Sequence, residues 1–224
     1  MYPFLEPLLL SLQLAFIVTV LLFVLSLPLI YFIYFYSFRS KPVLKAIVSL
    51  PLVLPPTVLG YYLLLILRPD GWLGQFSEAV LDTRLVFSFP GLVIGSMVFS
   101  LPFMINPILS ALENLPNTYQ EAAYTLGKSK WNTLWHVLLP NVRSSVVIAI
   151  IMTFAHTIGE FGVILMIGGN IPGQTRVASI AIYNEVEMLN FDKADLYALI
   201  LLVFSFAVLL PVYLYQNKKS QPLT

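Results

Sequence analysis

Four long segments of this sequence contain no charged residue: 8–37, 46–67, 85–112 and 196–217. Each is long enough to cross a membrane, since a spanning helix needs about 20 apolar residues. A fifth apolar segment, residues 144–167, has only His156 and Glu160 as ionisable side chains. With 58% hydrophobic and 10% charged residues, the chain has too little polar surface to cover a soluble globule. The sequence therefore predicts an all-α integral membrane protein with five membrane helices.

Residues 168–194 leave the count open between five and six membrane helices. The segment is too polar to span the membrane as a whole. Its middle, residues 176–188, can form a short helix that lies at the outer surface or dips back into the bundle.

The Lys and Arg residues of the short loops indicate which helix ends face the cytoplasm. Eight of the twelve basic residues are cytoplasmic if residues 38–45, residues 113–143 and the C-terminal tail lie inside. The N-terminus is then outside and the C-terminus inside. We expect a single transmembrane domain over residues 1–217, with a cytoplasmic loop at about 113–142 and a short cytoplasmic tail at 218–224.

The second apolar segment contains helix-breaking residues in the run SLPLVLPPTVLGYY. Pro51, Pro55 and Pro56 each lack a backbone N–H and clash with the preceding turn, so the helix must break or kink there. Irregular backbone at membrane depth is tolerated where it is buried in protein or lines a wet cavity. A kink that only shapes helix packing explains the same residues, and both interpretations stay open here.

The loop at 113–142 has the pattern of two short amphipathic helices. Asn117 with Gln120 three residues later forms a possible capping box. Gly127 suits the left-handed position that ends a helix. A second helix is expected after Ser129, and we expect Pro140 to stop it. Two such helices between membrane spans form a projection suited to docking.

The same loop contains A-x-x-x-x-G-K-S from Ala122 to Ser129, one glycine short of a phosphate-binding loop. That loop needs a buried strand before it and a helix that starts at the Lys-Ser pair. Here the preceding residues have a helical pattern, and the loop has no room for a parallel sheet. We therefore expect no catalytic residue in this chain and no ATP hydrolysis by it.

His156 and Glu160 lie four residues apart, so their side chains can meet on one helical face. Glu160 is about 24 Å from the cytoplasmic end of its span at 1.5 Å per residue, which predicts a position near the outer interface. A structural pair or an outer gate at a wet helix end is one interpretation, and a proton relay is the other. Gly159 and Gly162 beside Glu160 indicate a close helix approach or a helix break.

Several stretches carry a resemblance to a known family. The run EAAYTLGKSKWNTLWHVLLP resembles the signature loop of the permease subunits of bacterial ABC importers. The matching residues are Glu121, Ala122, Ala123, Gly127, Leu139 and Pro140, with Val137 where isoleucine is usual. The runs LPLVLPPTVLGYYLL and IGEFGVILMIGGNIPGQTR are similar to the molybdate permease branch, with Gln174 in place of the expected glutamate.

This resemblance implies a type I importer permease in a bacterial-type inner membrane. Its implied partners are a second copy of the chain, separate ABC ATPase subunits, an extracytoplasmic oxyanion-binding protein and membrane lipid, but no nucleic acid. It implies no cofactor and no metal site. The matched loop residues would couple ATP hydrolysis on the partner to transport, whereas Pro55, Pro56, Thr57, Gly159 and Glu160 would shape the pathway or its gate.

The implied cargo is molybdate, and tungstate has the same chemistry. No Lys or Arg lies in the five apolar segments, and an uncharged cavity suits an anion that must be released again. Candidate polar residues for that cavity are Thr57, Ser96, Ser100, Asn106 and Thr153. The aromatic run at 31–36 is expected at the cytoplasmic interface. A sulfate or thiosulfate permease and an ion-coupled secondary transporter remain the alternatives.

Overall fold

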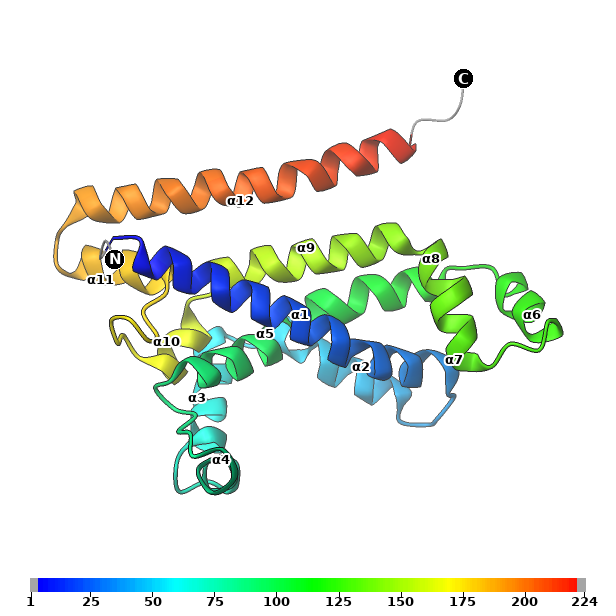
Figure 1. Ribbon diagram of the computed structural model, residues 1–224, viewed down its shortest axis with the longest axis horizontal. Helices are drawn as coiled ribbons and strands as arrows, with labels where there is room; N and C mark the ends of the chain where they lie inside the picture. Colours follow the sequence, from blue (N-terminus) through cyan, green and yellow to red (C-terminus); the bar gives the residue numbers. More distant parts are fainter. Residues whose placement is uncertain (1–3, 221–224) are drawn as a thin grey trace.

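The computed structural model describes residues 4–220, and every regular element among them is a helix. Three helices are long and apolar enough to cross a membrane: α1 (Glu6–Phe35), α5 (Phe89–Glu113) and α12 (Phe191–Ser220). They run along the long axis of the molecule together with α9 (Arg143–Gly159), as Figure 1 shows. The all-α membrane fold expected from the apolar segments is confirmed.

Two further candidate spans are bent helix pairs. The first joins α2 (Lys41–Ser49) and η1 (Leu50–Leu52) to α3 (Pro56–Leu67) with a bend of 109°. The second joins residues 130–141 to α9 with a bend of 83°. Counting each pair as one span gives up to five spans among the described residues.

The sixth membrane helix left open by the sequence is absent from the described residues. The relevant segment forms α11 (Ala178–Glu187), which is about 15 Å long at 1.5 Å per residue, half of what a bilayer requires. It packs against the start of α12 and against α1. It therefore belongs to one end of the bundle and does not cross it.

The core lies where α1, α5 and α9 pack on one another. Although α1 is apolar on all sides, its residues Leu14, Val18 and Leu22 form the buried stripe at helical spacing. They meet fully buried residues of α5 such as Leu92 and Ile105. This three-helix contact holds the two ends of the molecule, which carry the irregular elements, at a fixed separation.

Two predicted span boundaries differ from the structure. The segment expected at 85–112 begins its helix only at Phe89, because Phe87 has a positive φ of 57° and Ser88 caps the helix by accepting a hydrogen bond from the Gly91 N–H. The segment expected at 144–167 ends its helix at Gly159, and the chain resumes as α10 (Gly162–Gly168). At Phe87 and Ser88 the missed feature is backbone geometry that hydropathy does not report, whereas the break after Gly159 is one that Gly159 and Gly162 had indicated.

The remaining short elements gather at the two ends of the bundle (Figure 1). One end carries α10, α11 and the N-terminal ends of α1 and α12, with α4 (Trp72–Leu81) projecting beyond α3. The opposite end carries α6 (Thr118–Thr125), α7 (Lys130–Thr133) and α8 (Leu139–Asn141). Of the predicted tail, residues 218–220 continue α12 and residues 221–224 lie outside the described residues.

Candidate functional site

The first candidate site is the knob, residues 117–141, at the end of the bundle that carries α6. Its first helix ends at Gly127, which has the predicted left-handed φ of 72°. The Gly127 N–H donates to the Tyr124 carbonyl (2.9 Å) and the Lys128 N–H donates to the Ala123 carbonyl (3.0 Å). This pair of bonds is the Schellman motif, which satisfies the carbonyls left free at a helix end. Gly127 therefore fixes the turn between the two halves of the knob.

The predicted capping box at the start of α6 is wrong. Asn117 precedes the helix but its side chain makes no capping hydrogen bond. Gln120 instead accepts a hydrogen bond from the Tyr34 hydroxyl (3.3 Å) and donates one to Tyr124 (3.0 Å). A contact from α1, 86 residues away in sequence, has replaced the local one.

The second half of the knob begins as predicted but ends later. The Ser129 side chain accepts a hydrogen bond from the Asn132 N–H and caps α7. Pro140 was expected to stop the helix, and the helical course ends one residue later, at Asn141, before the bend at Val142. The turn before it, η2 (Leu134–Leu138), is a π-helix. Widening of that turn accommodates a proline ring that would clash with the carbonyl four residues earlier.

The outward face of the knob is apolar and has no partner among the described residues. Leu126 is 79% exposed and Tyr119 is 41% exposed, whereas Ala123 is buried. A hollow of about 380 Å³ lies on this face, lined by Thr118, Tyr119, Ala122, Ala123, Leu126, Lys128 and Val137. Glu121 and Ala122 are also exposed. Exposed apolar side chains around a hollow outside the membrane spans are typical of a protein-docking surface.

The remaining loop-signature residues lie at the base of the knob. Leu139 is 8% exposed and packs in the main core, whereas Pro140 is exposed. They therefore connect the docking surface to the bend that leads into α9.

The aromatic run at 31–36 holds the knob in place, a role that its composition did not indicate. Tyr31 packs edge-on against Trp131 with ring centroids 5.2 Å apart. The Lys130 ammonium lies 4.6 Å above the Tyr36 ring, within range of a cation–π interaction. With the Tyr34 to Gln120 hydrogen bond, three contacts tie both halves of the knob to the end of α1.

The structure excludes a phosphate-binding loop at Ala122–Ser129. A helix, α6, precedes the Gly-Lys-Ser run, and Gly127 terminates it. The described residues contain no strand that could place a glycine-rich loop against a nucleotide. They also contain no group of three or more His, Cys, Asp or Glu side chains that could hold a metal ion.

The second candidate site lies where two broken spans meet. The Pro55–Pro56 break starts α3, with Pro55 in an extended conformation at ψ 133°. A Cβ atom on Gly162 would lie 2.8 Å from the Pro56 Cβ, so α10 and α3 touch at a contact that only glycine permits. Thr57 is exposed beside it. The structure thus brings the proline break and the glycine break together, which the sequence did not predict.

Gly159 and Gly162 have different roles at this break. An added Cβ on Gly159 would meet nothing within 4 Å, so Gly159 ends α9 without a close approach. The Ser179 hydroxyl of α11 donates a hydrogen bond of 2.6 Å to the Glu160 carbonyl that the break leaves free. The helix break was predicted correctly, and α11 supplies its partner.

The expected His156 and Glu160 pair does not form. His156 shares a hydrogen bond of 2.9 Å with Ser100 and stacks on Phe103. Glu160 is only 2% exposed, which contradicts the expected wet helix end. Neither of its carboxyl oxygens has a hydrogen bond of normal geometry among the described residues, although Ser96 lies beside it. No hydrogen bond among the described residues joins the Glu160 carboxyl group to His156.

Most polar candidates for a cavity lining are internal to the helix bundle. Ser96, Ser100 and Thr153 are each 0% exposed between α5 and α9. Asn106 donates a hydrogen bond of 3.1 Å to Ser49 and links α5 to α2. Ser100 and Asn106 thus join helices, whereas the Ser96 and Thr153 hydroxyls have no hydrogen-bond partner among the described residues. Thr57 is the candidate that remains exposed.

Comparison with known proteins gives one matching family. Residues 26–218 match the family described as "Binding-protein-dependent transport system inner membrane component". The chain is 43% identical over 204 residues to the molybdenum transport system permease protein ModB of Azotobacter vinelandii, covering 91% of this chain and 90% of that relative. It is 34% identical to a probable sulfate transport system permease protein cysT of Zygnema circumcarinatum, covering 88% of this chain and 68% of that relative.

Solved structures share the fold. A bacterial ABC transporter that imports alginate superposes with a TM-score of 0.79 at 16% identity, covering 99% of this chain and 81% of that one. The inward-facing methionine transporter MetNI superposes with a TM-score of 0.73 at 16% identity, covering 99% and 98%. At 16% sequence identity, the similarity to these two structures establishes the arrangement of the helices alone.

Proposed function

The chain belongs to the family of binding-protein-dependent transport system inner membrane components, and on this premise we propose that it carries molybdate through the membrane as the permease of an ATP-driven importer. The observation that carries the cargo is the 43% identity to a molybdenum permease over nine-tenths of both chains. Tungstate, with the same charge and shape, is expected to share the route.

The chain is a transport component, and a separate subunit hydrolyses ATP. We propose that the knob docks on that ATPase. Its exposed apolar face around Leu126 and the hollow beside Ala122 offer a surface that no described part of the chain covers. Glu121, Ala122, Ala123 and Gly127 would form the contact, and Leu139 and Pro140 would pass movement of the knob into α9.

The orientation follows from the charges near the knob. Lys45 of α2 forms an ion pair of 2.6 Å with Glu113, and Lys128 and Lys130 lie in the knob itself. Basic residues near the ends of spans favour the cytoplasmic side. We propose that the knob and the C-terminus are cytoplasmic and that the N-terminus is outside. The transmembrane domain is then residues 1–217, the coupling loop about 113–142 and the tail 218–224.

Transport of an oxyanion requires a wet path through the membrane. Because the serines and threonines between α5 and α9 are buried, we propose that two copies pack together and form the path between them. An extracytoplasmic binding protein would deliver the oxyanion, and lipid surrounds the exposed apolar faces. ATP binding would draw the two knobs together and turn the path from inward-facing to outward-facing.

The paired helix breaks are the proposed gate region. Pro55, Pro56 and Thr57 start α3, and Gly159 and Glu160 end α9, with Gly162 touching Pro56. Breaks in neighbouring spans free backbone groups that can line a cavity. Movement of α9 by the knob would reach this contact directly, since α9 runs from the knob to Gly159.

A sulfate permease is the second candidate, and the 34% identity to a probable sulfate permease favours it over other cargo. Sulfate and molybdate share charge and tetrahedral shape, so the permease itself offers little basis to distinguish them. An ion-coupled secondary carrier is disfavoured, because no hydrogen bond among the described residues joins His156 to Glu160.

Competition between oxyanions tests the cargo. Proteoliposomes would contain this chain, its ATPase and its binding protein, with ATP inside and labelled molybdate outside. We expect uptake to survive a large excess of sulfate. Uptake abolished by sulfate would keep the importer and change its cargo. Uptake that needs no ATP and is abolished by a protonophore would overturn the proposal in favour of the secondary carrier.

A further inference from the structure

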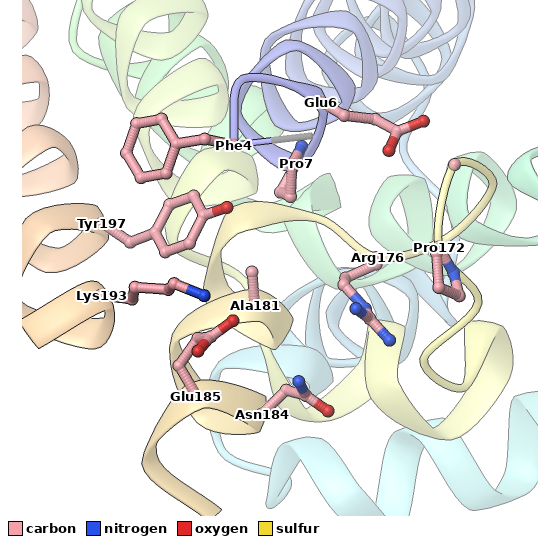
Figure 2. Close-up of a pocket in the computed structure, with 11 residues that line it drawn as sticks. Phe4, Glu6, Pro7, Pro172, Arg176, Ala181, Asn184, Glu185, Lys193 and Tyr197 are labelled. Carbon is pink, nitrogen blue, oxygen red and sulfur yellow. The ribbon is translucent and has the colours of Figure 1, made fainter. Parts of the chain in front are cut away.

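A polar cavity lies where α1 and α12 begin, away from both candidate sites. It has a volume of about 300 Å³ and is lined from α1, α11, α12 and the loop that precedes α11. Figure 2 shows Lys193 and Tyr197 of α12 pointing into it; in this view the Glu185 carboxyl group lies next to the end of Lys193, and the Arg176 guanidinium points away from both. Glu6 of α1 completes the charged groups.

The charges around this cavity are balanced and incompletely paired. Two carboxylates, Glu6 and Glu185, face two cations, Arg176 and Lys193. Arg176 donates hydrogen bonds to Asn170. Lys193 makes no ion pair or hydrogen bond with the described residues. An unpaired ammonium beside carboxylates suits a ligand that carries both a phosphate and a cation.

A second, apolar cavity of about 250 Å³ is lined mainly from the same two helices. Its lining residues are Leu5, Leu8, Leu9, Ser11, Leu12, Ile158, Ile200, Leu201 and Phe204. Tyr197 of the polar cavity and Leu201 of the apolar one are four residues apart, so they lie on one face of α12. Phe4 stacks on Tyr197 with ring centroids 4.5 Å apart, at the boundary between the cavities.

The length of the groove matches one leaflet of a bilayer. From Lys193 to Phe204 α12 rises about 16 Å at 1.5 Å per residue. Half of the hydrocarbon core is about 15 Å thick. Both helices begin at this end, so the polar cavity lies at headgroup level and the apolar cavity at acyl-chain level.

We propose that this groove binds one glycerophospholipid with a zwitterionic headgroup and a primary ammonium, as in phosphatidylethanolamine. The phosphate lies near Lys193 and Arg176, and the ammonium donates to Glu185 and Glu6. One acyl chain fills the apolar cavity. An anionic headgroup fits less well, because it would add negative charge beside two carboxylates without supplying a cation. The bound lipid fastens α12, whose span is only 11% buried, to α1.

Lipid retention by the assembled transporter tests the proposal. The complete complex of permease, ATPase and binding protein would be incubated with vesicles of phosphatidylethanolamine, phosphatidylcholine or phosphatidylglycerol, washed in detergent and analysed by mass spectrometry. We expect phosphatidylethanolamine to be retained about tenfold more than the other two, as for one additional charge-assisted contact. Equal retention of phosphatidylglycerol or of phosphatidylcholine would contradict the headgroup assignment.

Two matched pairs of variants locate the site. Leu201→Trp fills the apolar cavity, whereas Leu202→Trp adds the same ring at a neighbouring residue that is 66% exposed. Lys193→Glu removes the unpaired cation, and Arg84→Glu makes the same charge change at an exposed residue outside the groove. We expect about tenfold loss of retained lipid only for Leu201→Trp and Lys193→Glu. All four variants must first assemble with the ATPase at wild-type yield.

Two other results would overturn the lipid assignment. Equal retention by Leu201→Trp and Leu202→Trp would mean that the apolar cavity holds no acyl chain. Cross-linking of Lys193 to the binding protein or to a second copy in the assembled transporter would mean that a protein covers the groove.

Discussion

Replacing Gly127 with alanine tests how much one backbone angle contributes to the proposed binding of the knob to the ATPase. An alanine Cβ at this position would meet nothing within 4 Å, so the substitution introduces no clash. The cost is conformational, because a left-handed φ of 72° is unfavourable for an L-residue with a Cβ by about 1–2 kcal/mol. Asparagine tolerates this region better than alanine does. Gly127→Asn is therefore the matched control.

This cost is expected to appear in ATPase binding. The turn at Gly127 is exposed, so few contacts oppose a change in its shape. A strain of about 1–2 kcal/mol would shift the equilibrium between the native and an altered knob by a factor of about 5 to 30. We predict a loss of ATPase affinity within that range for Gly127→Ala and a smaller loss for Gly127→Asn. Titration of the ATPase onto permease in lipid nanodiscs measures both. Wild-type affinity for the alanine variant, or an equal loss for both variants, would mean that the left-handed conformation of residue 127 does not control ATPase binding.

Three further predictions concern both candidate sites. Leu126→Asp should abolish ATPase binding. The side chain is 79% exposed, so the midpoint of thermal unfolding should not change, and a lowered midpoint would contradict this. Gly162→Ala should lower the midpoint of thermal unfolding, because its new Cβ would lie 2.8 Å from the Pro56 Cβ. Gly159→Ala should leave the midpoint unchanged, and thermal unfolding of both variants measures the difference. Glu160→Gln should retain ATP-driven uptake, since no hydrogen bond among the described residues depends on a carboxylate there, whereas a proton relay requires loss of uptake.

The spans and their breaks could be predicted because their signals are local. Charge-free runs of sufficient length, the Pro55–Pro56 pair and the glycines around Glu160 each act on the backbone nearby. Gly127 is the clearest case, because the left-handed residue after a helix is usually glycine. That the knob docks on a partner stays a prediction from the same local pattern.

What the sequence could not supply depends on contacts between distant residues. Gln120 was expected to cap its own helix, but Tyr34 of α1 binds it. His156 and Glu160 could have met on one helical face, but Ser100 of α5 bonds the histidine and the glutamate is buried without a hydrogen bond among the described residues. The meeting of Pro56 and Gly162 also joins segments about 100 residues apart, and no periodicity in either segment indicates it.

The proposal that a separate ATPase drives molybdate through this chain is tested most directly by measuring molybdate uptake with and without an active ATPase subunit. Proteoliposomes with permease and binding protein would be prepared with the wild-type ATPase, with a hydrolysis-deficient ATPase and without ATPase, each with ATP inside. We predict uptake only with the wild-type ATPase, and loss of uptake when the permease carries Gly127→Asp in the knob. Uptake without the ATPase, or undiminished uptake by a well-folded Gly127→Asp variant, would contradict it.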